Sequence, residues 1–153
     1  MKNSFIAAIV LSFGLMACGG GGEAPAETTK AKPQSMLKKK IDPMQDKGVG
    51  PITSVTIDAE VNQEMAAAGK DVYDKMCTAC HKPTEKFIGP APKGVLDRRT
   101  PEWVMNMILN PEQMVKENDL AKKLLMEYNG SPMANQNLTE EEARQVLEYF
   151  RTL

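Results

Sequence analysis

Apolar side chains recur at helical spacing from about residue 58 onward. In the first such stretch they are separated by four, three, four and four positions, which keeps one face of a helix apolar over four turns. The positions concerned are Val61, Met65, Ala68, Val72 and Met76. This spacing predicts an amphipathic helix that ends close to Met76.

Two shorter helices are expected in the middle of this region. Thr100 is a suitable N-cap and Pro101 is favoured at the first helical position, so a second helix should begin there. Asn110-Pro111 should end it. A third helix is predicted from about Lys116 to Tyr128, with its apolar residues on one side.

The last predicted helix has the clearest start. Thr139 is followed three positions later by Glu142, the pattern of a capping box, in which each side chain accepts from the backbone N–H of the other residue. The side chains expected to face inward are Ala143, Val146, Leu147 and Phe150. No segment has the alternating pattern of a β-strand, so the predicted fold class is all-α.

The composition changes at about residue 58. Residues 19–57 contain a run of four glycines, four prolines and the run Lys38-Lys39-Lys40, without a sustained apolar period. Such a composition predicts a flexible tether at residues 18–57 and a folded domain at residues 58–153.

Residues 1–17 have the features of a leader. Lys2 provides a positive start, and the apolar run from Phe5 to Leu15 is too short to span a membrane permanently. The sequence Leu15-Met16-Ala17-Cys18 resembles the bacterial lipobox, which predicts a signal peptide of lipoprotein type at residues 1–17 and a lipid on Cys18. The alternative is an ordinary signal peptide cleaved at Ala17. On the lipoprotein interpretation the protein is exported and membrane-anchored, facing the periplasm or the cell exterior.

The motif Cys77-Thr-Ala-Cys80-His81 indicates covalent attachment of a c-type haem. Two thiols three residues apart can each bond to one porphyrin, and the following histidine can bind its iron. A thioredoxin-like redox motif would follow a strand, and none is predicted upstream. A zinc site would need four ligands, whereas His81 is the only histidine. With Cys18 assigned to lipid, no cysteine remains for a disulfide.

Further spacings extend this motif into a family pattern. The chain resembles the class I c-type cytochromes over residues 58–153, and this resemblance implies their fold: four to five short helices around one covalent haem. In that family, a glycine lets the first helix press against the last one, and an aromatic residue fills the crossing. The matching residues are Gly69, Tyr73, Cys77, Cys80, His81, Gly89, Pro90, Val146, Tyr149 and Phe150.

The resemblance also implies roles around the haem iron. His81 would be one axial ligand, and the Pro90 carbonyl would accept a hydrogen bond from its second ring nitrogen. Met133 follows Pro132 in the loop before the last helix and lies 52 residues after His81, as expected for the second axial ligand. Met126 and Met114 remain alternatives.

Three other residues are candidates for contacts with the haem propionates. The indole N–H of Trp103 could donate to one propionate, and Arg98 or Arg99 could neutralise one. The equally weighted alternative is a core tryptophan and two surface arginines. Residues 58–153 carry 12 basic and 16 acidic side chains, a net charge of −4, so no nucleic-acid partner is expected.

These features together predict a one-electron carrier rather than an enzyme. With His81 and Met133 both bound to iron, no coordination position would remain for a substrate, and redox protein partners would exchange electrons through the haem edge. The alternatives are a haem-bearing subunit of a larger redox complex, a haem enzyme or a sensor. A peroxidase built from paired domains would need a second Cys-x-x-Cys-His motif, which this sequence lacks.

Overall fold

The computed structural model describes residues 42–153, which form an all-α fold, as predicted. The elements are α1 (Gln63–Met76), the short 3-10 helix η1 (Val95–Asp97), α2 (Pro101–Leu109), α3 (Pro111–Glu117), α4 (Asp119–Glu127) and α5 (Glu140–Phe150). No residue from 42 to 153 lies in a strand. The predicted signal peptide, Cys18 and the tether up to residue 41 lie outside the described residues.

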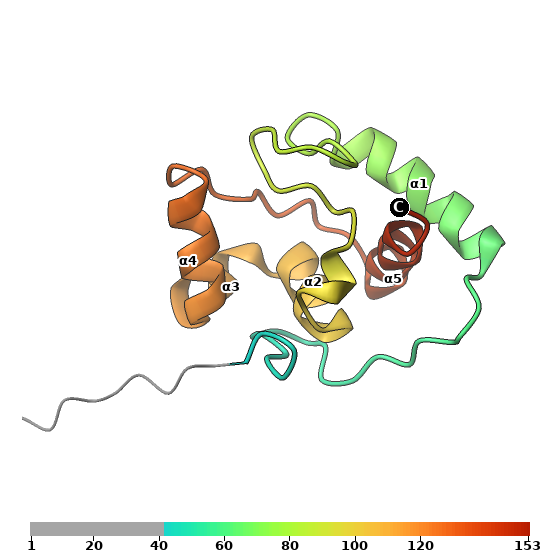
Figure 1. Cartoon of the computed structure of the whole chain (residues 1–153), viewed down its shortest axis with the longest axis horizontal. Coiled ribbons are helices and arrows are strands. Elements are labelled where there is room, and N and C mark those ends of the chain that lie inside the picture. Colours follow the sequence, from blue (N-terminus) through green and yellow to red (C-terminus); the bar gives the residue numbers. More distant parts are fainter. Residues whose placement is uncertain (1–41) are drawn as a thin grey trace, which may run out of the picture. The chain divides into compact units, whose positions relative to one another are not determined.

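Helices α1 and α5 cross closely, and Figure 1 shows them together on one side of the domain, opposite α3 and α4. A methyl group on Gly69 would overlap the Gln145 backbone carbonyl, so only glycine permits this approach. Beside the crossing, the buried Tyr73 ring lies 5.3 Å from the Tyr149 ring and 5.9 Å from the Phe150 ring, measured between centroids. The predicted contact between glycine, aromatic residue and last helix is confirmed.

The starts of α2 and α5 agree with the sequence. The Thr100 hydroxyl accepts from the Trp103 backbone N–H at 3.1 Å, and Pro101 is the first residue of α2. Both halves of the capping box between Thr139 and Glu142 are present at α5. These side chains satisfy backbone donors that a helix start leaves unpaired, which fixes where each helix begins.

The single helix predicted from Lys116 to Tyr128 is wrong, because two helices meet inside it. Helix α3 starts at Pro111, directly after α2, and α4 starts after Asn118. Asn118 has an extended backbone, and its side-chain oxygen accepts from the Ala121 backbone N–H at 2.9 Å. This local hydrogen bond begins a new helix where the apolar spacing alone suggested continuity.

The predicted domain boundary at residue 58 is also wrong. Residues 42–57, which we call the strap, pack on the helical domain; Figure 1 shows them running along α2 and α3 toward α1. Ile52 is part of the apolar core. The buried Asn106 side chain accepts from the Ile52 N–H at 2.9 Å and donates to the carbonyls of Lys47 and Ile52. The strap is ordered without forming a helix, because side chains of the domain pair with its backbone groups. The sequence therefore shows no helical periodicity there.

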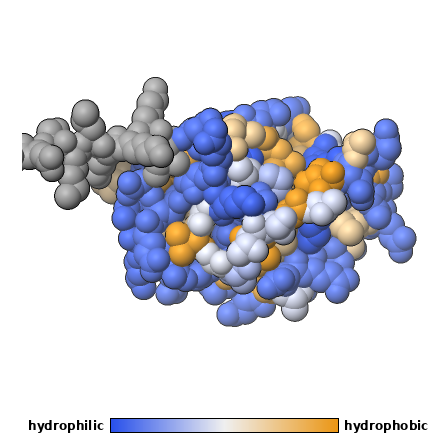
Figure 2. Space-filling view, turned by 90° about the horizontal axis from the view of Figure 1, so that it is seen from below, coloured by the Kyte–Doolittle hydropathy of each residue, from blue (hydrophilic) through white to orange (hydrophobic). Residues whose placement is uncertain are grey.

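Figure 2 shows the molecule from the side along which the strap runs. This surface is mostly hydrophilic, with its apolar side chains gathered in separate small patches. Within residues 42–153, no helix has both the length and the apolar character needed to cross a membrane.

Candidate haem site

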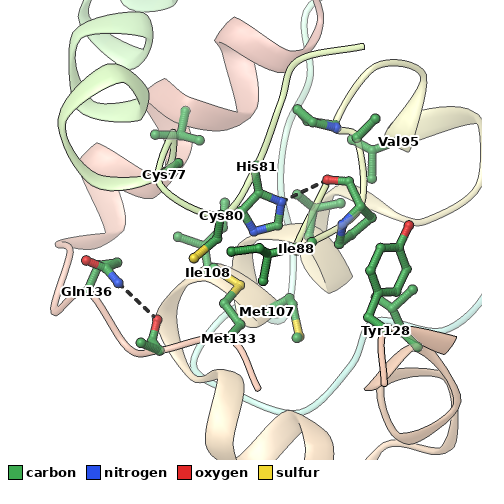
Figure 3. Close-up of a pocket in the computed structure, with 18 of the residues that line it drawn as sticks. Cys77, Cys80, His81, Ile88, Val95, Met107, Ile108, Tyr128, Met133 and Gln136 are labelled. Atoms are coloured by element: carbon green, nitrogen blue, oxygen red, sulfur yellow. Dashed lines mark hydrogen bonds between the residues drawn. The ribbon is translucent and has the colours of Figure 1, made fainter. Parts of the chain in front are cut away.

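A cavity of about 250 Å³ lies within the helical domain and has mainly apolar walls. Its lining comes from the end of α1, the segment after it, α2, α4, α5 and the loop between α4 and α5. Figure 3 shows the side chains that gather around this space, among them Cys80, His81, Ile88, Met107 and Met133. The structure thus brings the predicted haem-attachment motif and the predicted distal methionine to one cavity.

The imidazole of His81 is held in one orientation. Its Nδ1 lies 2.8 Å from the Pro90 carbonyl oxygen, which can only accept, so Nδ1 carries the proton and donates. Gly89 lies against the ring so closely that a methyl group on it would overlap the imidazole. Tyr73 donates its hydroxyl to the His81 carbonyl at 3.0 Å. Nε2 has no hydrogen-bond partner among residues 42–153, which leaves this nitrogen available as a metal ligand.

The two cysteines of the motif line the same cavity as free thiols. Burial, together with the neighbouring Cys80, raises the pKa of the Cys77 thiol to about 11, so Cys77 is protonated at neutral pH. This is the opposite of the low pKa that makes a redox-active or metal-binding cysteine reactive. Helix α1, not a strand, precedes the motif, as expected if it is not thioredoxin-like. Residues 42–153 contain no cluster of three or more cysteine, histidine or acidic side chains suited to a metal ion.

The three methionines considered as the second iron ligand differ clearly in their surroundings. Met133 lines the cavity and is partly buried. The alternative Met126 is 74% exposed and does not line the cavity. The alternative Met114 is fully buried in the core, where its sulfur accepts from the Val49 backbone N–H at 3.0 Å, a strap contact. Neither alternative faces the site.

Met107 on α2 also lines the cavity, and it is not among the site residues predicted from the sequence. A methionine among apolar residues at helical spacing gives no sign that its helix face borders a cofactor site. The one available signal is its place between Val104 and Ile108, which line the same cavity.

The three residues considered for contacts with the haem propionates have different hydrogen-bond partners. The Trp103 indole N–H donates to Asn118 Oδ1 at 3.2 Å, so it is already used inside the protein and its predicted propionate contact is not supported. The Arg98 guanidinium donates to the carbonyls of Ala91, Lys93 and Gly94, which holds the segment before α2 in place. The first observation favours a core tryptophan. Arg98 lines the cavity as well, but its guanidinium is already used by these three carbonyls.

Arg99 is the exception. Its guanidinium stacks 5.1 Å from the Trp103 ring and lines the cavity. The Nε atom is buried and lacks a hydrogen-bond partner among the described residues. Burial and the nearby Arg98 charge lower the pKa of this guanidinium, although it remains charged. A buried donor without a partner costs about 1–3 kcal/mol, so it indicates a missing acceptor such as a carboxylate.

These side chains fit a flat apolar group that carries carboxylates and an iron atom. The apolar walls suit the ring, the orphaned Arg99 donor suits a carboxylate, and His81 Nε2 suits the metal. The two thiols lie where they can bond to the edge of such a ring.

Residues 66–153 match the model of the Cytochrome c family. The chain belongs to the cytochrome c family. Its cofactor is therefore one covalently attached haem c, for which Cys77 and Cys80 provide the thiols. This assignment also confirms the all-α cytochrome c fold predicted from the sequence.

Solved structures of other cytochromes are similar to this one. A cytochrome c from Rhodothermus marinus is 40% identical, with 67% of this chain and 88% of that chain covered and a TM-score of 0.65. An engineered form of that cytochrome, bound to a carbene intermediate, is 39% identical with a TM-score of 0.62, over 67% of this chain and 88% of the other. The cytochrome c domain of a Pseudomonas putida protein is 27% identical with a TM-score of 0.51, over 55% of this chain and 85% of that domain. The comparison with curated proteins gave no match.

Proposed function

We propose that this cytochrome is a class I, one-electron carrier whose haem iron is bound axially by His81 and Met133. The observation that carries the proposal is the position of these two side chains, which line one cavity and point into it from different segments (Figure 3). The hydrogen bond from His81 Nδ1 to Pro90 leaves Nε2 for the iron. Met133 is the one of the three methionines considered from the sequence that borders the cavity.

This ligand pair would favour electron transfer over catalysis. A thioether sulfur is a soft neutral ligand that stabilises Fe(II) relative to Fe(III) and so raises the reduction potential. If His81 and Met133 both hold the iron, no position on the metal would remain for a small molecule. The apolar walls would keep water away from the bound haem, which would limit reorganisation between the two oxidation states. The haem supplies the redox change, while the protein fixes ligand geometry and solvent access.

We further propose that the protein is a lipoprotein tethered to a membrane through Cys18. Support comes from the sequence Leu15-Met16-Ala17-Cys18 after an apolar leader, and from the Gly- and Pro-rich segment that follows. The strap shortens the predicted tether from residues 18–57 to residues 18–41. The carrier would then shuttle electrons between respiratory partners on the exported side of the membrane.

A second candidate is a haem-bearing subunit of a larger redox complex, a haem enzyme or a sensor. The observation that favours an enzyme is the engineered Rhodothermus marinus cytochrome bound to a carbene intermediate. That observation concerns an engineered relative. For this chain, the same chemistry would require Met133 to leave the metal.

The proposal is tested on the full-length protein purified from membranes with its haem. Denaturation in alkaline pyridine should give the spectrum of haem with two thioether bonds, and a redox titration should fit a single one-electron step. The native protein should bind cyanide slowly and incompletely. Rapid, complete cyanide binding would favour the enzyme or sensor, and stable co-purification with other redox subunits would favour the complex.

A further inference from the structure

The strap and the haem cavity lie on different faces of α2. Glu102 and Asn106, four positions apart, accept from backbone N–H groups of the strap. Val104 and Met107 line the cavity instead. Trp103 is connected to both, because it lines the cavity and its indole N–H reaches the strap through one intervening side chain.

This connection consists of buried polar groups. The Trp103 indole donates to Asn118 Oδ1 at 3.2 Å, and Asn118 Nδ2 donates to both carboxylate oxygens of Asp46, at 3.0 and 2.8 Å. Trp103 and Asn118 are 3% and 7% exposed. The strap backbone also packs on the indole, since a methyl group on Gly48 would lie 3.4 Å from Trp103 Cδ1. The strap therefore fixes the position of the Trp103 ring.

The Trp103 ring in turn holds Arg99. The guanidinium carbon lies 5.1 Å from the centroid of the ring, an attraction that is stronger away from water. Among residues 42–153 the guanidinium has one hydrogen-bond partner, the Arg98 carbonyl at 2.7 Å from Nη1, and its buried Nε has none. Thr100, the next residue, donates its hydroxyl to the Asp46 carbonyl at 2.6 Å. Asp46 thus contacts the chain on both sides of the Arg99 site.

The charges near Arg99 come from three parts of the fold. Burial and then the Arg98 charge lower the pKa of the Arg99 guanidinium, and the charges of Glu127 on α4 and Asp46 on the strap oppose them. No acidic side chain of residues 42–153 lines the cavity itself. The other titratable side chains of the cavity wall are Tyr73, Cys77, Cys80, His81, Arg98 and Tyr128. The acceptor for Arg99 Nε must therefore come from the bound group.

We propose that Asp46 of the strap is a positioning residue for the haem site, which acts through Asn118 and Trp103 to hold Arg99 against a haem carboxylate. This inference rests on the haem-loaded carrier proposed above. A cation held in this way favours the ionised carboxylate and lowers the pKa of that carboxylate. The strap thereby keeps one buried negative charge paired beside the redox centre.

The reduction potential reports this pairing. An ionised carboxylate without a partner stabilises Fe(III) and lowers the potential, whereas a neighbouring guanidinium offsets the negative charge. If Arg99 moves away, the carboxylate is left in an apolar cavity and binds a proton at higher pH. The potential then falls as the pH rises through the pKa of the carboxylate. With Arg99 in place, the potential stays constant over the same range.

The test is a redox titration of the haem-loaded, full-length protein, followed by its absorption spectrum from about pH 5.5 to 8. Asp46→Ala and Asp46→Asn remove the same charge, but the asparagine keeps a side-chain oxygen that can accept from Asn118. Arg99→Gln removes the proposed cation. Ile52→Ala is the control, because it weakens the packing of the strap without touching the polar connection to Arg99.

The wild type and Ile52→Ala should have a potential that changes little with pH. In Arg99→Gln the potential should match the wild type most closely at low pH and fall at high pH, with the transition about 1–3 pH units higher than in the wild type. Asp46→Ala should show a transition in the same direction. Asp46→Asn should differ from the wild type only by an offset that is the same at every pH.

A constant potential in Asp46→Ala would overturn the proposal, and so would identical pH profiles of Asp46→Ala and Asp46→Asn. A constant potential in Arg99→Gln would show that Arg99 does not meet a carboxylate. Trp103→Phe, which keeps an aromatic ring without the N–H, tests the same connection with the strap unaltered and should resemble Asp46→Ala. A wild type without a single one-electron step would instead contradict the proposed function.

Discussion

Gly69 of α1 lies directly against the Gln145 carbonyl of α5, with no room for a methyl group between the two backbones. This contact sets the point along each helix at which α1 crosses α5. Because α1 ends one residue before Cys77, the crossing also sets the position of the haem-attachment motif. The close approach therefore connects the packing of two helices to the geometry of the site.

Gly69→Ala should destabilise the protein by about 1–3 kcal/mol, because a methyl group at this position forces the backbones of α1 and α5 apart. Thermal unfolding of the haem-loaded variant measures the loss. Ala67→Ser, on the exposed side of the same helix, is the control and should change stability little. A Gly69→Ala variant as stable as the control would show that the crossing tolerates a side chain.

A second prediction concerns Glu148, a carboxylate buried in α5. It accepts hydrogen bonds from Arg144 at 2.5 Å, from Arg151 at 2.6 Å and from the Asn62 backbone N–H at 2.9 Å. Burial alone would raise the pKa of Glu148, but the hydrogen bonds from Arg144 and Asn62 and the charges of both arginines outweigh it, so the pKa is lower than 4.5. The folded state therefore gains stability above pH 4.5 and loses it as the pH falls through the lowered pKa.

Glu148→Gln should accordingly cost about 3 kcal/mol at neutral pH, because it leaves two arginines beside a neutral group. The difference in unfolding free energy between wild type and variant should shrink as the pH falls below 4.5. Urea unfolding at several pH values measures it. Glu141→Gln, an exposed change on the same helix, should show no such pH-dependent difference. A constant difference across this pH range would contradict the assigned pKa shift.

The strap supplies a third prediction. Both carboxylate oxygens of Asp46 accept from Asn118 Nδ2, at 3.0 and 2.8 Å, and Asn118 in turn accepts from the Trp103 indole. Asp46→Ala should therefore lower the unfolding free energy by about 1–3 kcal/mol. It should also make the strap more accessible to limited proteolysis. Ser54→Ala is the control and should leave both properties unchanged, because Ser54 is an exposed strap residue whose side chain makes no hydrogen bond to any of residues 42–153.

The starts of α2 and α5 were predicted correctly from the sequence, because nearby side chains determine where these two helices begin. Thr100, Thr139 and Glu142 each accept from a backbone N–H three residues away, so their effect is visible in a short stretch of sequence. Gly69 and the α5 residues that it contacts are far apart along the chain. Their contact could be predicted only from the resemblance to a family. The His81–Pro90 hydrogen bond was predicted on the same basis, and its geometry is present.

The failures have a common cause, which is long-range pairing of polar side chains. Asn118 ends one helix and starts the next because its side chain also pairs with Trp103 and Asp46, which no periodicity in the sequence reports. The strap looked like a tether because its backbone partner, Asn106, lies more than fifty residues away. The same pairing occupies the Trp103 indole N–H, which the sequence had offered as a candidate donor to a propionate.

A fourth prediction addresses the proposed membrane anchor. Cys18→Ser should abolish lipidation but leave haem incorporation intact, because residue 18 lies far from the motif at Cys77 to His81. The variant should be recovered in soluble form or as the uncleaved precursor, and mass spectrometry of the N-terminal peptide distinguishes these outcomes. Finding wild-type mature protein without lipid would end the lipoprotein interpretation.

The most direct test of the proposed electron carrier is the optical spectrum of Met133→Ala, recorded from the visible to the near infrared with the haem attached. Loss of the sulfur ligand should remove the weak red-region band of ferric iron bound to methionine, lower the reduction potential and permit fast cyanide binding. Met126→Ala and Met107→Ala are the controls, the first on an exposed side chain and the second on a neighbouring cavity residue, and both should keep the band. If the band persists in Met133→Ala and disappears in Met107→Ala, the proposed ligand is wrong; if the wild type itself lacks the band, the His81/Met133 carrier is contradicted.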